Sequence, residues 1–271
     1  MTVTTVTTPL ARQKRSALGW AIADTKAVTW RNLVTLRRTP QLLVFSTIQP
    51  VIFVLMFRYV FGGAIRIPGI DYVNYLMPGI FAQTVTFGAI QTGIGLAEDL
   101  HRGLIERFRS LPMARSAVLA GRTLADLVRN VFVVALMLVV GYLVGFRVQT
   151  GVLGLLAGVA VILLFGFSLT WIFAIIGLSA PNAETAQAMS FPVLAPLVFV
   201  SSAFVAIDTM PGWMQPFAKY QPVSIAVDAV RSLVLGGQFH DPAKVLGSLA
   251  WSIGIVVVFA PLAVAVYRRT A

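Results

Sequence analysis

The stretch HRGLIERFRSLP, residues 101–112, lies between two long apolar segments and concentrates charge in the middle of the chain. Leu100, Leu104 and Phe108 recur every fourth residue, so they share one face of a helix. Pro112 cannot continue a helix and ends it. The charged side chains of the expected helix, residues 98–109, are Glu98, Asp99, Arg102, Glu106, Arg107 and Arg109. A short amphipathic helix of this kind lies on a membrane or docks against a partner, and we favour the partner.

Composition places the chain in a bilayer. Of its 271 residues, 58% are hydrophobic and 11% are charged, whereas soluble domains average roughly 45–50% and roughly 25%. The formal net charge of +11 fits cytoplasmic loops that face anionic lipid better than it fits a nucleic-acid partner. The chain has no cysteine and only two distant histidines, His101 and His240, so we expect no metal site.

The apolar runs predict an all-α, polytopic membrane protein. A span needs about 20 apolar residues. A helix over 17–38, with Trp30 among basic residues, is expected to lie in the headgroup region after a disordered tail. The predicted layout places residues 1–38 before a permease domain, 39–271, which contains an inner loop, 97–116, and a broken, re-entrant outer segment, 207–244. The six expected spans are 41–62, 74–96, 117–145, 152–178, 188–206 and 245–267.

Lysine and arginine set the orientation. With the amino terminus inside the cell, the inner regions contain thirteen basic residues: Arg12, Lys14, Arg15, Lys26, Arg31, Arg37, Arg38, Arg102, Arg107, Arg109, Arg115, Arg268 and Arg269. The outer loops then contain five: Arg66, Arg147, Lys219, Arg231 and Lys244. This excess predicts that both termini are cytoplasmic and that the amphipathic helix lies in the cytoplasm.

Two ordered motifs carry a family resemblance. The first is GLIERFRSLPMAR, residues 103–115, followed by Gly121, Arg122 and Asp126. The second is PGWMQPFAKYQPVS, residues 211–224, followed by Arg231. Together with the six-span layout they resemble type-2 ABC exporter permeases, and more narrowly the daunorubicin/doxorubicin-resistance permease subfamily. The resemblance covers most of the chain but does not identify a cargo.

The resemblance implies a permease of the bacterial plasma membrane that moves a hydrophobic or amphiphilic drug, lipid or glycolipid outward. A second permease, identical or related, pairs with it, and two cytosolic ATPase subunits that bind ATP and Mg dock beneath. The inner-loop helix then acts as the ATPase-coupling element, residues 17–38 touch the same ATPase, and Glu184 is a second contact. The coupling residues implied are Leu100, Leu104, Glu106, Arg107, Phe108, Arg109 and Pro112.

The chain contains no Gly-x-x-x-x-Gly-Lys-Ser/Thr phosphate loop, because no lysine follows a glycine. We therefore expect no ATP site and no other cofactor on this chain, and no catalytic residue. The sequence LGGQ, residues 235–238, is similar to part of the ATPase signature. It lacks the serine and lies on the predicted outer side, so it is expected to be a turn that ends a helix.

Polar residues inside the expected spans have two interpretations: they hold helices together, or they line a pathway. Asp126 is spaced to pair with Arg122 or Arg129, and Asp228 with Arg231. Candidate substrate contacts on the second and fifth spans are Gln83, Phe87, Gln91, Phe191, Phe199 and Ser202. Such a lining of phenylalanine and neutral polar groups suits an amphiphilic cation or a lipid.

Two other function classes are compatible with a polytopic membrane chain. An ion-gradient-driven secondary transporter or channel is the alternative, but no series of ionisable residues crosses the expected spans as a proton relay would. An intramembrane enzyme that acts on lipid would need clustered histidine or acidic residues at an interface, and the spans contain no such cluster.

Overall fold

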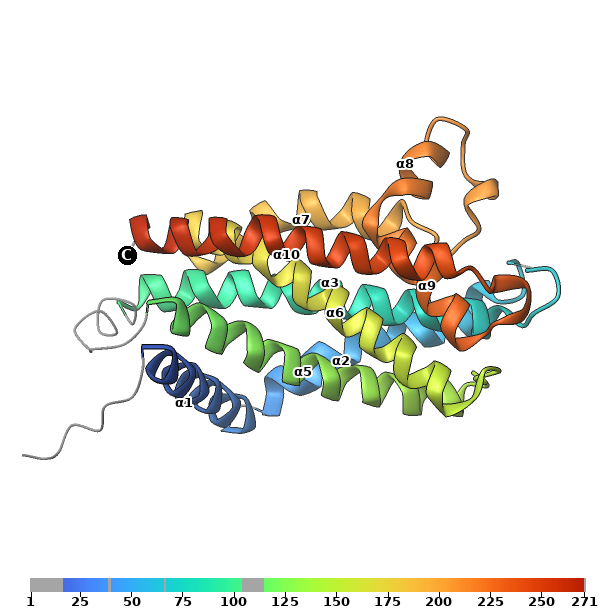
Figure 1. Ribbon diagram of the computed structural model, residues 1–271. Helices are drawn as coiled ribbons and strands as arrows, with labels where there is room; N and C mark the ends of the chain where they lie inside the picture. The colour runs from blue at the N-terminus through green and yellow to red at the C-terminus, as the bar shows by residue number, and fades with distance from the viewer. Residues whose placement is uncertain (1–16, 39, 66, 104–114, 271) are drawn as a thin grey trace, which may run out of the picture.

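The computed structural model describes residues 17–38, 40–65, 67–103 and 115–270, and in this part of the chain every regular element is helical. Figure 1 shows long helices packed side by side along one direction. The elements are α1 (Ala17–Arg38), α2 (Pro40–Leu55), η1 (Met56–Phe61), α3 (Tyr72–His101), α5 (Arg115–Leu143), α6 (Gly151–Ser179), α7 (Ala183–Phe199), η2 (Ile207–Thr209), α8 (Gln215–Tyr220), α9 (Pro222–Val234), η3 (Gly237–Phe239) and α10 (Pro242–Thr270). The all-α class is confirmed.

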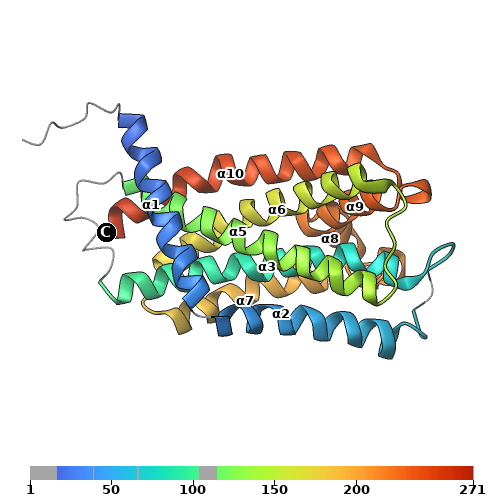
Figure 2. The same cartoon turned by 90° about the horizontal axis from the view of Figure 1, so that it is seen from below.

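The bundle has two distinct ends. At one end, which we call the α1 end, α1 runs across the direction of the long helices (Figure 2). The other end, the α8 end, carries α8, α9 and the connections between helices (Figure 1). Helix α1 packs mainly on α5, where a Cβ on Gly121 would come within 2.7 Å of the Val28 Cβ. A helix that crosses the bundle end in this way has the placement that an interfacial helix requires.

Four of the described helices are long and apolar enough to span a membrane: α3, α5, α6 and α10. The predicted first span corresponds to α2 together with η1, which is a stretch of π-helix. The apolar part of this segment, Thr47–Phe61, is shorter than the four long helices. The predicted fifth span, 188–206, corresponds to α7, which has 17 residues. The count of six spans therefore stays a prediction.

Helix α7 begins five residues earlier and ends seven residues earlier than the predicted span. It begins at Ala183 because the Asn182 side-chain oxygen accepts a hydrogen bond from the Thr185 amide, at 2.8 Å, and so caps the helix. It ends at Phe199 because the next residues turn to contact α9: the Ser202 amide donates to Ser224 Oγ at 3.0 Å. This tertiary bonding is not visible in the hydropathy pattern.

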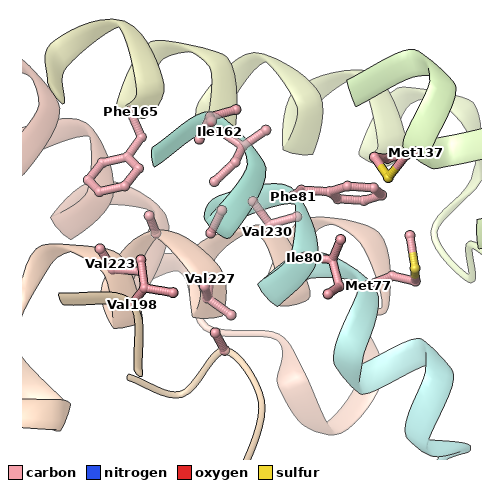
Figure 3. Packing of buried hydrophobic residues seen from close by; sticks show 14 of the residues in the cluster. Met77, Ile80, Phe81, Met137, Ile162, Phe165, Val198, Val223, Val227 and Val230 are labelled. Atoms are coloured by element: carbon pink, nitrogen blue, oxygen red, sulfur yellow. The ribbon is translucent and has the colours of Figure 1, made fainter. Parts of the chain in front are cut away.

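Helix α3 is the centre of the bundle. In the most apolar stretch of α3, 78% of the residues are buried, whereas in that of α10 only 17% are. At the same time, α3 has the lowest hydropathy of the four long helices. Most polar side chains in the central part of α3 are therefore buried in protein, whereas the apolar surface of α10 faces outward, as expected for a membrane bundle. The main core joins α3 to its neighbours through Met77, Ile80, Phe81, Met137, Ile162, Phe165, Val198, Val223, Val227 and Val230 (Figure 3).

Small residues bring α3 and α6 into backbone contact. A Cβ on Gly177 of α6 would overlap the Gly93 carbonyl of α3, so no larger residue fits this crossing without moving a helix. Nearer the α8 end, a Cβ on Gly166 would lie 2.6 Å from the Val85 Cβ. Close approach at small residues is a common way for helices to associate in a membrane, and here it fixes the position of α3.

One continuous helix over residues 98–109 was expected, and the structure differs. Helix α3 runs to His101, the Gly103 amide donates to the Leu100 carbonyl, and Gly103 has a φ of +68°. A glycine in this left-handed conformation ends a helix. Leu100 consequently belongs to α3 and packs against a second buried cluster that includes Leu96 and Leu119. Residues 104–114 lie outside the described residues.

The α8 end is organised by a buried arginine on α9. The Arg231 guanidinium is 3% exposed and pairs with Asp228 at 3.0 Å, which confirms the predicted pair. It also donates to the carbonyls of Tyr75 at 3.0 Å and Ser202 at 2.6 Å, and stacks over the Tyr75 ring. One cation thus joins α9, α3 and the turn after α7. The following LGGQ segment is a turn, with Gly236 and Gly237 at positive φ, as predicted.

Replacing Arg231 by methionine should destabilise the protein by about 3 kcal/mol or more, because Asp228 and the carbonyls of Tyr75, Ser202 and Ala203 lose a buried partner. The exposed Lys219 provides a matched control in the same segment, and Lys219→Met should change stability by less than about 0.5 kcal/mol. Urea unfolding of the two purified variants in detergent measures the difference. Equal stability of Arg231→Met and wild type would show that this cation does not hold the α8 end together.

Candidate functional site

A cavity of about 360 Å³ lies between α1, α2, α3 and α5, and we call it the α3–α5 cavity. It runs from the α1 end toward the middle of the bundle, and its volume lies in the range of roughly 300–1,000 Å³ that small-molecule sites occupy. Its lining combines amides, hydroxyls, charged pairs and apolar side chains. The lining residues are Asn32, Leu33, Thr35, Gln49, Pro50, Gln83, Thr84, Phe87, Gly88, Gln91, Ile94, Gly95, Glu98, Arg122, Ala125, Asp126, Arg129, Asn130 and Val133.

A chain of ion pairs follows one wall of this cavity. Arg122 of α5 pairs with Asp99 of α3 at 2.7 Å and approaches Asp126 at 3.9 Å. Asp126 pairs in turn with Arg129 at 3.2 Å and accepts a hydrogen bond from the Thr92 hydroxyl at 2.6 Å. Both arginines predicted as partners of Asp126 therefore contact it. Because these side chains are mostly buried, the pairs are screened little by water. We call Asp99, Arg122, Asp126 and Arg129 the ion-pair ladder.

Glycines on α3 make room for the ladder. A Cβ on Gly95 would overlap the Arg122 guanidinium, and one on Gly88 would overlap the Asn130 side chain. The Gly88 carbonyl also accepts a hydrogen bond from Arg129 at 2.7 Å. The close approach of α5 to α3 therefore depends on missing side chains at these two positions. It places charged groups of α5 against the α3 backbone, where their donors are satisfied.

Two amide groups that line the cavity are not satisfied. Gln83 is 2% exposed, and its side-chain oxygen Oε1 has no hydrogen-bond partner. On α1, which also borders the cavity, the Asn32 side-chain nitrogen Nδ2 is buried and also lacks a partner. A buried polar atom without a partner is costly, by roughly 1–3 kcal/mol, and native proteins rarely keep one without a reason. Two residues of the lining thus each keep a buried polar atom without a partner, an acceptor on Gln83 and a donor on Asn32.

A second, more open cavity of about 670 Å³ lies at the α8 end and surrounds the Arg231 network. Its lining is strongly charged: Asp208, Asp228 and Asp241 stand against Lys219, Arg231 and Lys244. Asp228 is shared between Arg231 at 3.0 Å and Lys244 at 3.5 Å. Because Asp228 and Arg231 hold the fold together at this point, we assign the network a structural role.

The structure groups only some of the predicted substrate contacts. Gln83, Phe87 and Gln91 line the α3–α5 cavity together. Ser202 lines the cavity at the α8 end, where its hydroxyl donates to Asp228 at 2.8 Å. Phe191 and Phe199 lie exposed on α7 and line neither cavity. The six residues therefore do not form a single described site.

The predicted coupling residues fall mostly in the undescribed segment. Leu104, Glu106, Arg107, Phe108, Arg109 and Pro112 lie outside the described residues. Leu100 is packed inside the bundle, as described above. Glu184 is exposed in the first turn of α7, and nearby Ala186 packs against Ala97 of α3. Glu184 thus lies at the α1 end, on the same side as the inner loop.

The cavity residues that the sequence pattern did not single out include Asn32 and Asn130. Asn130 could have been found, because it is four residues after Asp126 and shares its face of α5. No comparable spacing points to Asn32, which in the sequence is one polar residue among several in the expected interfacial helix. Its role becomes visible only when α1 is packed against α2 and α5.

Comparisons with known proteins agree with this architecture. Residues 23–235 match the family described as ABC-2 type transporter. A "Daunorubicin resistance ABC transporter permease protein" of Streptomyces coeruleorubidus is 39% identical over 263 residues, which cover 97% of this chain and 92% of that protein. A "Probable doxorubicin resistance ABC transporter permease protein" of Mycobacterium tuberculosis is 30% identical over 250 residues, or 92% and 89% of the two chains. The chain belongs to the ABC-2 type transporter family, as a multi-pass membrane permease that works with an ATPase partner.

Proposed function

We propose that this permease forms the pathway through which a hydrophobic or amphiphilic compound leaves a bacterial cell, with energy from a separate ATPase. Two copies of that ATPase bind ATP and Mg, and this chain binds neither. The permease lies in the plasma membrane with six spans and both termini in the cytoplasm. The names of its relatives, which refer to daunorubicin and doxorubicin resistance, support a drug-like amphiphile as cargo.

The observation that carries the proposal is the connection between the inner loop and the α3–α5 cavity. Asp99 stands two residues before the end of α3, where the loop begins. Through Arg122 it is linked to Asp126, which borders the cavity. A movement of the loop would therefore act directly on charged groups of the cavity wall. This is the arrangement required if ATP-driven motion of a partner is to alter a binding site inside the bundle.

A second permease completes the pathway in this proposal. Helix α7 exposes Met189, Phe191 and Phe199, and α2 exposes Ile48 and Ile52 in the same way. Both helices are short, and α7 also contains two prolines, which suits packing against protein better than an isolated span in lipid. We assign these faces to contact with the second permease, so Phe191 and Phe199 would meet the cargo at the boundary between subunits.

The energy source provides the first test. Inside-out vesicles that contain this permease and the ATPase encoded beside it should accumulate daunorubicin when ATP is supplied. ATP together with a Walker-A lysine variant of the ATPase should give accumulation at the level of empty vesicles. Accumulation driven by a proton gradient without ATP would contradict the proposal and favour the secondary transporter.

The coupling residues provide the second test. Glu106→Ala with Phe108→Ala should weaken capture of the ATPase by about tenfold or more, because a charged pair and an apolar anchor are lost together. Trp213→Ala is the control, since Trp213 is exposed at the α8 end. Co-purification from detergent-solubilised membranes measures both variants. Equal capture by the double variant and wild type would exclude this segment as the docking element.

A further inference from the structure

We infer that the α3–α5 cavity, which lies within a single permease subunit, binds the uncharged, hydrogen-bonding head of an amphiphile. The inference rests on the proposed function, because it names the chemistry of the cargo and the place where it is held. It concerns binding alone, so it can be tested without the ATPase and without transport.

Gln83 supplies the first part of the argument. Its side chain is buried in the central helix, borders the cavity, and keeps its oxygen Oε1 without a partner. Neighbouring polar groups on α3 behave differently: Thr84 and Thr86 donate to carbonyls one turn earlier, at 2.7 Å each. The free acceptor is therefore a local feature of Gln83, and it requires a donor such as a hydroxyl or an amide N–H.

Asn32 supplies a complementary group from α1. Its Nδ2 is a buried donor without a partner and borders the same cavity. A hydroxylated or amide-bearing head both donates and accepts hydrogen bonds, which is the chemistry that these two groups lack. An aliphatic group can satisfy neither of them, which excludes a purely hydrocarbon occupant.

The charges of the cavity argue for an uncharged head. Each of the four charged residues that line it has a partner of opposite sign: Asp126 contacts Arg122 and Arg129, and Glu98 pairs with Arg102. Arg122 also contacts Asp99. Since the carboxylates and guanidinium groups are already compensated, a charged head would find no unpaired counter-ion among the described lining residues and would lose its hydration.

Apolar groups complete the site. Leu33, Pro50, Phe87 and Val133 line the cavity beside the amides. A pocket with apolar walls and a few convergent polar groups suits a molecule that has an apolar body and a small polar head. A lipid with an uncharged headgroup and a free drug-like amphiphile share this chemistry.

The test uses a matched pair of fluorescent probes, daunorubicin and its N-acetyl derivative, which differ in the charge of the amino sugar. The full-length permease is placed in phosphatidylcholine nanodiscs, and empty nanodiscs correct for partition into lipid. Both probes should bind with Kd values within about threefold of each other. Gln83→Leu should weaken both by about tenfold, the effect of one lost hydrogen bond in a buried site.

Two further variants control for folding. Gln238→Leu changes the same residue type at the α8 end, where Gln238 lines the other cavity, and should leave both Kd values unchanged. Asn32→Leu changes the part of the α3–α5 cavity lining that peripheral helix α1 supplies, and should also weaken the binding of both probes. Thermal unfolding of each variant identifies any that fails to fold, and Asn32→Leu keeps the site testable if Gln83→Leu does not fold.

Addition of monoglucosyl diacylglycerol to the nanodiscs distinguishes a lipid from a free amphiphile as the molecule that the site binds. Displacement of the probes by this uncharged glycolipid assigns the site to lipid, and no displacement assigns it to free amphiphiles. The inference is overturned if daunorubicin binds more than about tenfold tighter than its N-acetyl form, or if Gln83→Leu and Asn32→Leu bind like wild type. ATP-driven transport that persists in that case would leave the proposed function intact.

Discussion

An ionised carboxylate inside an apolar bundle is tolerated only when cations and hydrogen-bond donors surround it, and Asp126 is held in this way. Asp126 pairs with Arg129 at 3.2 Å and accepts a hydrogen bond from the Thr92 hydroxyl at 2.6 Å. Arg122 links Asp126 to Asp99. These contacts fix how α5 lies against α3. The same crossing depends on glycine at positions 88 and 95, since a Cβ would overlap the Asn130 side chain at the first and the Arg122 guanidinium at the second. The α3–α5 cavity borders this crossing, so its shape depends on the same contacts.

The two ends of the bundle use buried charge differently. At the α8 end, Arg231 is 3% exposed and bonds mainly to backbone carbonyls, so its contacts fix turns and the short helix α9 in place. At the α1 end, the ladder joins side chains of two separate helices and begins beside the inner loop. A network of side-chain pairs can rearrange when helices shift, whereas one cation bonded to several carbonyls cannot do so without breaking the fold. The side-chain pairs of the ladder therefore suit the transmission of a helix movement, and the carbonyl-bonded Arg231 suits the anchoring of the α8 end.

The sequence predicted the all-α fold, the long helices and the pairing of Asp126 and Asp228 because each depends on local spacing or composition. It placed Gln83, Phe87 and Gln91 on one polar stripe for the same reason. It did not predict that Gly103 ends α3, that α7 stops at Phe199, or that Ser202 faces a different cavity from Gln83. Each of these depends on backbone conformation or on contacts between distant segments. Asn32 joins the site only through the packing of α1, which no local pattern encodes.

If this permease acts as proposed, α3 borders a pathway that is open to the cytoplasm before the ATPase binds ATP. Because the chain contains no cysteine, a single Gln91→Cys substitution on the exposed part of α3 provides a unique label site. A membrane-impermeant maleimide should label it in inside-out vesicles, and the rate should fall by about tenfold when the ATPase is trapped with ATP. Labelling that occurs only in right-side-out vesicles, or at a rate that ATP does not change, would contradict the account.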